Sequence, residues 1–194
     1  MTSAFAIPTD EVLVTRARAG DLEALERVYR AFETPVYNLA RRICRSPQDA
    51  EDVLQETFLE VMRSIHRFRG DGPLAGWIRR VAASKALMRL RQGRHAREES
   101  SLEEAFDAEA TGIPSLFPGL AGVAHERMDL ETALAKRPET ARAVVWLHEV
   151  EGYTHEEIAG MMGRTASFSK SQLARAHARL RGWLAAGAEV RTCT

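Results

Sequence analysis

The side chains best suited to chemistry with a partner are acids and bases grouped in separate segments. Directly after Ser46-Pro47, four polar side chains follow at helical spacing: Asp49, Asp52, Gln55 and Glu56. Carboxylates in the first turns of a helix are stabilised by the positive end of its dipole. An acidic helix start of this kind can bind a basic protein surface.

Basic side chains occupy two other segments. Residues 79–97 and residues 164–181 each carry several Lys and Arg but no acid, and the acidic residues 98–109 lie between them. The formal net charge of zero therefore hides strong local segregation. Any one basic block could be the solvated face of an ordinary helix. Two such blocks at separate helical sites favour a surface that holds nucleic-acid phosphates.

A third candidate is the loop formed by residues 67–73, which includes Arg69 and Asp71 and leads into Trp77. Basic residues interleaved with aromatics beside a glycine-rich loop can hold an unstacked base. The alternative is that Trp77 and the nearby aromatics are core residues, which is the more frequent role of aromatics at helical spacing.

The chain offers no constellation typical of an enzyme. It has no glycine-rich phosphate loop and no nucleophile elbow, and its histidines lack metal-ligand spacing. Two cysteines, Cys44 and Cys193, support neither a disulfide framework nor a Cys-rich metal site, and Cys44 is predicted to be a small core residue. We expect no enzymatic activity, no cofactor and no metal.

The compartment follows from what the sequence lacks. No apolar run approaches the ~20 residues needed to span a bilayer. Residues 1–10 lack the basic start and apolar core of a secretory signal. We expect a cytoplasmic protein without membrane insertion.

The segments that must position these groups are predicted to be helical. Apolar residues recur at three- and four-residue steps over residues 22–43, although Pro35 should bend or split that helix near Thr34. Ser46 as N-cap and Pro47 at the first position predict a second helix over residues 47–68. A third helix is predicted over residues 74–92.

A second helical unit is predicted after an aperiodic segment. Thr154 and Glu157 form a capping-box pattern, and Gly163 should end the short helix that they begin. A longer basic helix over residues 168–183 follows, and together the two helices describe a helix-turn-helix. Polar side chains at the start and on the outer face of the longer helix are candidate DNA contacts: Ser169, Lys170, Ser171, Gln172, Arg175 and Arg179.

The expected fold class is therefore all-α, with two small helical domains joined by a flexible linker. The boundaries are residues 10–97, 98–127 for the linker, and 128–186. A linker of this length would span roughly 30 Å as a relaxed coil and about 100 Å when fully extended.

Six motifs resemble regions 2 and 4 of the extracytoplasmic-function sigma factors of bacterial RNA polymerase. In the first domain they are DAEDVLQETF at residues 49–58, FRGD at 68–71 and WIRRVA at 77–82. In the second they are EGYTHEEIA at residues 151–159, with Lys170-Ser171 and Arg175-Ala176 further on. Both sets occur in the order and spacing of that family.

The resemblance implies a role for each candidate surface. Asp49, Asp52, Gln55 and Glu56 would bind core RNA polymerase. The −10 promoter element would be recognised and melted by Arg69, Asp71 and Trp77, with phosphates held by Arg79, Arg80, Lys85 and Arg89. The helix-turn-helix would read the −35 element, which lies roughly 35–70 Å away along the DNA. An anti-sigma protein is the usual further partner.

Two other functions compete with promoter-specific initiation. A stand-alone helix-turn-helix regulator would bind operator DNA as a dimer and sense a ligand through its first domain. A helical interaction protein would sequester a partner, and its basic faces would be solvated surface. The acidic cluster at residues 49–56 argues against the regulator, because a ligand-sensing domain does not need it.

Overall fold

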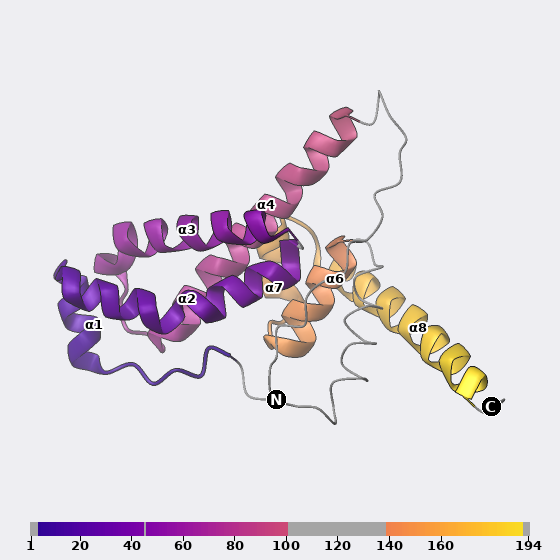
Figure 1. Cartoon of the computed structure of the whole chain (residues 1–194), viewed down its shortest axis with the longest axis horizontal. Coiled ribbons are helices and arrows are strands. Elements are labelled where there is room, and N and C mark those ends of the chain that lie inside the picture. Colours follow the sequence, from indigo (N-terminus) through magenta and orange to yellow (C-terminus); the bar gives the residue numbers. More distant parts are fainter. Residues whose placement is uncertain (1–3, 45, 101–138, 192–194) are drawn as a thin grey trace.

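The computed structural model describes residues 4–44, 46–100 and 139–191, and every regular element within those ranges is helical (Figure 1). The all-α prediction is confirmed. The amino-terminal elements are α1 (Glu11–Arg18), α2 (Leu22–Cys44), α3 (Pro47–Ser64), the 3₁₀ turn η1 (Ile65–Arg67) and α4 (Leu74–Ser100). The carboxy-terminal ones are α6 (Glu139–Val145), the π-helical turn η2 (Trp146–Val150), α7 (His155–Met162) and α8 (Ala166–Arg191).

The first unit is a bundle in which α2, α3 and α4 bury a shared apolar core. Phe32 of α2 and Ile78 of α4 are fully buried in it. The predicted split at Pro35 is wrong, because α2 continues through Pro35 to Cys44. Phe32 and Val36 are buried on either side of the proline, so tertiary packing offsets the helix hydrogen bond that Pro35 cannot donate.

The ends of α3 are set by local sequence. The Ser46 hydroxyl accepts a hydrogen bond from the Asp49 amide at 3.3 Å, which confirms the predicted N-cap. The helix ends at Ser64, earlier than predicted, and a 3₁₀ turn completes the segment. In the loop that follows, Gly70 has φ +81°, a left-handed conformation that glycine adopts without a Cβ clash. Helix α4 then runs beyond the predicted residue 92.

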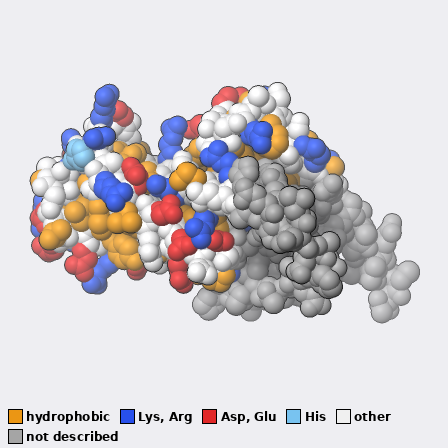
Figure 2. Space-filling view, turned by 90° about the horizontal axis from the view of Figure 1, so that it is seen from above, with side chains coloured by type: hydrophobic (Ala, Val, Ile, Leu, Met, Phe, Trp, Pro, Cys, Tyr) orange, Lys and Arg blue, Asp and Glu red, His pale blue; other side chains and the backbone are white. Residues whose placement is uncertain are grey.

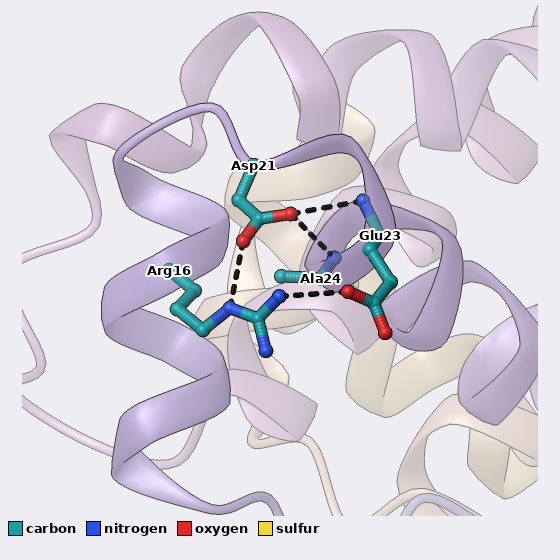
Figure 3. A network of polar contacts seen from close by, with 4 residues as sticks. All are labelled: Arg16, Asp21, Glu23 and Ala24. Atoms are coloured by element: carbon teal, nitrogen blue, oxygen red, sulfur yellow. Dashed lines mark hydrogen bonds and ion pairs between the residues drawn. The ribbon is translucent and has the colours of Figure 1, made fainter.

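A charged network fixes the corner between α1 and α2 (Figure 3). Arg16 donates hydrogen bonds to Asp21 at 2.7 Å and to Glu23 at 2.9 Å. The other Asp21 oxygen accepts from the amides of Glu23 and Ala24 at the start of α2. The bond from Arg16 and those amides lower the pKa of Asp21, so this carboxylate acts as a helix cap that stays charged.

The second unit has the predicted helix-turn-helix. Thr154 and Glu157 form both bonds of the capping box at the start of α7. Gly163 ends the helix in the left-handed conformation, with φ +60°. Helix α8 packs against α7 and α6, and its Leu173 and Ala176 are buried. The predicted linker lies almost wholly outside the described residues.

The two units pack directly against each other, α4 against α7 and α2 against α6 (Figure 1). Buried residues of both units form one apolar cluster. Among the described residues, no helix is long and apolar enough to span a membrane.

Candidate nucleic-acid and protein interfaces

The acidic group on α3 is held by a base from α4. Arg89 donates from Nε to Asp49 Oδ1 and from Nη2 to Asp52 Oδ2, both at 2.7 Å. The hydrogen bond to Asp49, and then the nearby charges of Asp49, Asp52 and Glu56, raise the pKa of Arg89. Gln55 is exposed and Glu56 is half-buried. The four polar residues and Arg89 therefore form one surface, which we call the acidic surface.

Charges of both signs stand side by side over this part of the molecule (Figure 2). Besides Arg89, Lys85 of α4 lies with Nζ 3.7 Å from Glu60 Oε2 of α3. Lys85 and Arg89 are four residues apart and so share one face of α4. That face is directed toward the acids of α3, whereas the sequence assigned both bases to DNA.

The other residues assigned to the −10 element lie in and after the loop between α3 and α4. Arg69, Asp71 and Arg80 are exposed. The Trp77 ring is half-buried and packs on Phe68, with ring centroids 5.5 Å apart and planes tilted by 39°. An aromatic pair therefore borders a loop that carries exposed bases.

On α8, the structure separates exposed from buried candidates. Lys170, Ser171 and Arg175 are exposed and Gln172 is half-buried, while the Arg179 side chain lies outside the described residues. Ser169 is fully buried, and its hydroxyl lies 3.0 Å from Nδ1 of His155. It is four residues before the buried Leu173, a spacing that places it on the inward stripe and could have been noticed in the sequence.

His148 of η2 and His155 of α7 form a stacked pair that the sequence pattern does not predict. The rings of His148 and His155 lie 4.3 Å apart with planes at 16°. Burial, followed by the charges of His148 and Lys170, lowers the pKa of His155, against smaller opposite effects of Glu156 and Glu149. Among the described residues, no group of His, Cys, Asp and Glu has the geometry to hold a metal ion.

Cys44 lies in the core as predicted. Its thiol is buried and approaches the Ala86 carbonyl at 3.6 Å. Burial, together with the charge of Asp49, raises the pKa of Cys44 to about 12. A thiol with such a pKa stays protonated at neutral pH and is a poor nucleophile.

Two parts of the chain match known protein-family models. The family model for Sigma-70 region 2 matches residues 28–96, and that for Sigma-70, region 4 matches residues 127–180. The ECF RNA polymerase sigma factor SigE of Mycolicibacterium smegmatis is 32% identical over 186 residues, which cover 92% of this chain and 70% of SigE. The ECF RNA polymerase sigma factor SigM of Mycobacterium tuberculosis is 30% identical over 192 residues, or 94% of this chain and 90% of SigM.

Solved structures show a related fold at lower identity. CnrH, in a complex with the cytosolic domain of CnrY, matches with a TM-score of 0.52 and 20% identity over 91% of this chain and 97% of that one. The sigma factor RpoE, in a complex with the anti-sigma factor NepR from Bartonella quintana, matches with a TM-score of 0.58 and 19% identity over 84% and 98% of the two chains. Both regions match, and the two ECF sigma factors named above align over more than nine-tenths of this chain. The chain therefore belongs to the extracytoplasmic-function family of bacterial RNA polymerase sigma factors.

Proposed function

We propose that the chain binds core RNA polymerase through the acidic surface of α3 and directs it to promoters by recognising their −10 and −35 elements. The observation that carries this proposal is the separation of charge between helices. Acids are grouped at the start of α3, and exposed bases lie on the α3–α4 loop, on α4 and on α8. A protein partner and DNA can therefore be engaged at the same time by different helices.

For the −10 element, the proposed contacts are Arg69, Asp71, Trp77, Arg80 and Lys85. The exposed bases would hold phosphates of the separated strand, and the Phe68–Trp77 pair borders the place where an unstacked base would lie. Arg89 has a different proposed role, because both of its bonds end on Asp49 and Asp52. It would position the acidic surface for the polymerase.

For the −35 element, the proposed contacts are Lys170, Ser171, Gln172 and Arg175 on α8, followed by Arg179. These residues follow one another along the recognition helix of a helix-turn-helix, the element that enters the major groove in such motifs. Ser169 would position the helix start through His155 rather than touch DNA.

The remaining attributes follow from this role. A specificity subunit needs no chemistry of its own, since the polymerase supplies the reaction. It acts where polymerase and chromosome are, which is the cytoplasm. RpoE and CnrH were solved in complexes with NepR and with CnrY, and we propose an anti-sigma protein as a partner of this chain also.

Run-off transcription with purified core polymerase tests the proposal. We expect promoter-dependent initiation with the chain and none without it. A stand-alone regulator would instead bind duplex DNA in the absence of polymerase and confer no initiation, an outcome that would refute the proposal.

Two sets of variants locate the surfaces. Asp52→Arg places a base beside Arg89 and should abolish binding to core polymerase, whereas Glu11→Arg, an exposed acid on α1, should have no effect. Lys170→Ala and Arg175→Ala should each weaken binding to −35 DNA and reduce its salt dependence by about one phosphate contact. An unchanged salt slope would remove that residue from the interface.

A further inference from the structure

The two units are joined by arginines that donate to backbone carbonyls across the interface. Arg142 of α6 is buried, at 6% exposure. Its Nε donates to the carbonyl of Arg42 at 3.0 Å, and its Nη2 donates to the carbonyl of Ile43 at 2.6 Å. Both carbonyls belong to the last turn of α2, where the helix itself supplies no donors. An arginine of the second unit therefore caps a helix of the first.

The reverse contact is also present. Arg91 of α4 donates to the carbonyls of Met161 and Met162, the last two residues of α7, at 3.2 and 3.4 Å. A cation at a helix C-terminus is favoured by the dipole as well as by the hydrogen bonds. Each unit thus completes the end of a helix in the other.

A third arginine joins α4 to the residues just before the capping box of α7. Arg79 of α4 donates to the Glu151 carbonyl at 2.7 Å, lies 3.8 Å from the Glu151 carboxylate and stacks 4.8 Å above the Tyr153 ring. At the edge of the same interface, the Arg42 guanidinium lies 4.1 Å above the Trp146 ring. The contacts are specific in geometry and charge, unlike a chance apolar contact.

This arrangement conflicts with simultaneous binding of both promoter elements. Helix α7 contacts α4 directly (Figure 1), whereas the −10 and −35 elements lie roughly 35–70 Å apart on DNA. Arg79, which the sequence assigned to DNA phosphates, also cannot hold a phosphate with the donor that it uses on Glu151. Binding of both elements therefore requires the two units to separate.

We propose that Arg79, Arg91 and Arg142 form a latch that keeps the free chain closed, with the helix-turn-helix folded against α4. The latch opens when polymerase and promoter bind. Its free energy is subtracted from that of promoter binding, so a weaker latch raises apparent affinity in proportion to the open fraction. That the free chain is closed does not depend on the proposed function. That closing weakens promoter binding rests on the proposed function.

The test measures the distance between the units in the full-length free chain. Donor and acceptor dyes are attached at Arg63→Cys on α3 and Gly160→Cys on α7, both exposed positions; a Cβ at Gly160 would meet nothing within 4 Å. Cys193→Ser removes one competing thiol. Cys44 is left in place because its buried thiol has a pKa of about 12.

Two latch variants are compared with one control. Arg142→Met removes the donors to α2, and Arg91→Gln removes an exposed guanidinium without disturbing the core of either unit. Arg30→Met is the control, because Arg30 is exposed and bonds Glu26 on the same helix. We expect lower energy transfer for both latch variants than for the control. Promoter DNA that carries both the −10 and the −35 element should bind the free latch variants about three- to tenfold more tightly.

Energy transfer equal to that of the control in Arg91→Gln, or in an Arg142→Met that keeps its helical content, would overturn the latch. The two proposals fail separately. If the dyes move apart but core polymerase ignores the chain, the latch stands and the proposed function falls. If polymerase initiates transcription but no latch variant changes the distance, the proposed function stands and the latch falls.

Discussion

Replacing Arg89 with Met is the sharpest test of how the acidic surface is built. Arg89 holds one oxygen of Asp49 and one of Asp52 at 2.7 Å each. The substitution removes the charge and both hydrogen bonds while keeping most of the aliphatic stem. Two opposite effects on polymerase binding follow, and their magnitudes decide the direction.

The first effect is electrostatic and favours the variant. An incoming base on the polymerase would lie on the far side of the carboxylates, about 8 Å from the Arg89 guanidinium. Repulsion at that distance in water is about 0.5 kcal/mol. The second effect is the loss of order in the carboxylates. Immobilising a freed side chain on binding costs about 0.5–1.5 kcal/mol, so two cost about 1–3 kcal/mol. The loss of order is larger, so the net loss of binding free energy is about 0.5–2.5 kcal/mol, and affinity should fall about 2- to 60-fold.

Equilibrium binding of fluorescently labelled chain to core polymerase measures this change, with Arg30→Met as a matched surface control. The variant should also lower the free energy of unfolding of the first unit by about 1 kcal/mol at low salt, since paired surface charges contribute little each. A different pattern would refute the reasoning. If polymerase affinity is unchanged while binding of single-stranded −10 DNA loses about one unit of salt slope, Arg89 is a phosphate contact.

Three further outcomes test the second unit and the core. Thr154→Ala should destabilise the second unit by about 1 kcal/mol in thermal denaturation, because it removes the hydroxyl that accepts a hydrogen bond from the Glu157 amide, whereas Thr154→Ser should not; equal melting of both variants would contradict the cap. Burial lowers the pKa of His155, so below pH about 6.5 the unfolded chain takes up a proton that the folded site resists. Stability should therefore fall from pH 8 to pH 5.5, and less so in His155→Gln; an identical fall would exclude His155. Cys44, whose thiol has a pKa of about 12, should resist iodoacetamide at pH 8 until guanidinium is added, as mass spectrometry would show; rapid labelling of the native chain would place it at the surface.

The elements that the sequence predicts well are those fixed by neighbours in the chain. The Ser46 cap, the Thr154–Glu157 box and the Gly163 helix end each depend on partners within a few residues. Pro35 shows the limit of local reasoning, because the cost that it imposes on α2 is offset by the burial of residues on either side. Only the packed structure contains that compensation.

In the candidate site, too, features set by neighbours in the chain could be predicted and contacts between distant segments could not. Exposure of Lys170 and Arg175 follows from helical periodicity, and the burial of Ser169 could have been predicted from its spacing to Leu173. The partner of Arg89 could not, because Asp49 is 40 residues away in the chain. Arg142 is less predictable still, since its acceptors on α2 are backbone carbonyls about 100 residues earlier, and a carbonyl carries no sequence signal.

Four bases of α4 are paired with other groups of the same molecule. Lys85 and Arg89 are directed at acids of α3, while Arg79 and Arg91 are directed at the second unit. Much of the basic block that the sequence assigns to external partners is therefore engaged inside the free molecule. Binding to polymerase or promoter would then be an exchange of partners by the same charged groups. Because exchanged ion pairs nearly balance, affinity should depend on which pairs the complex forms rather than on total charge, and this sensitivity is what a promoter-specific subunit requires.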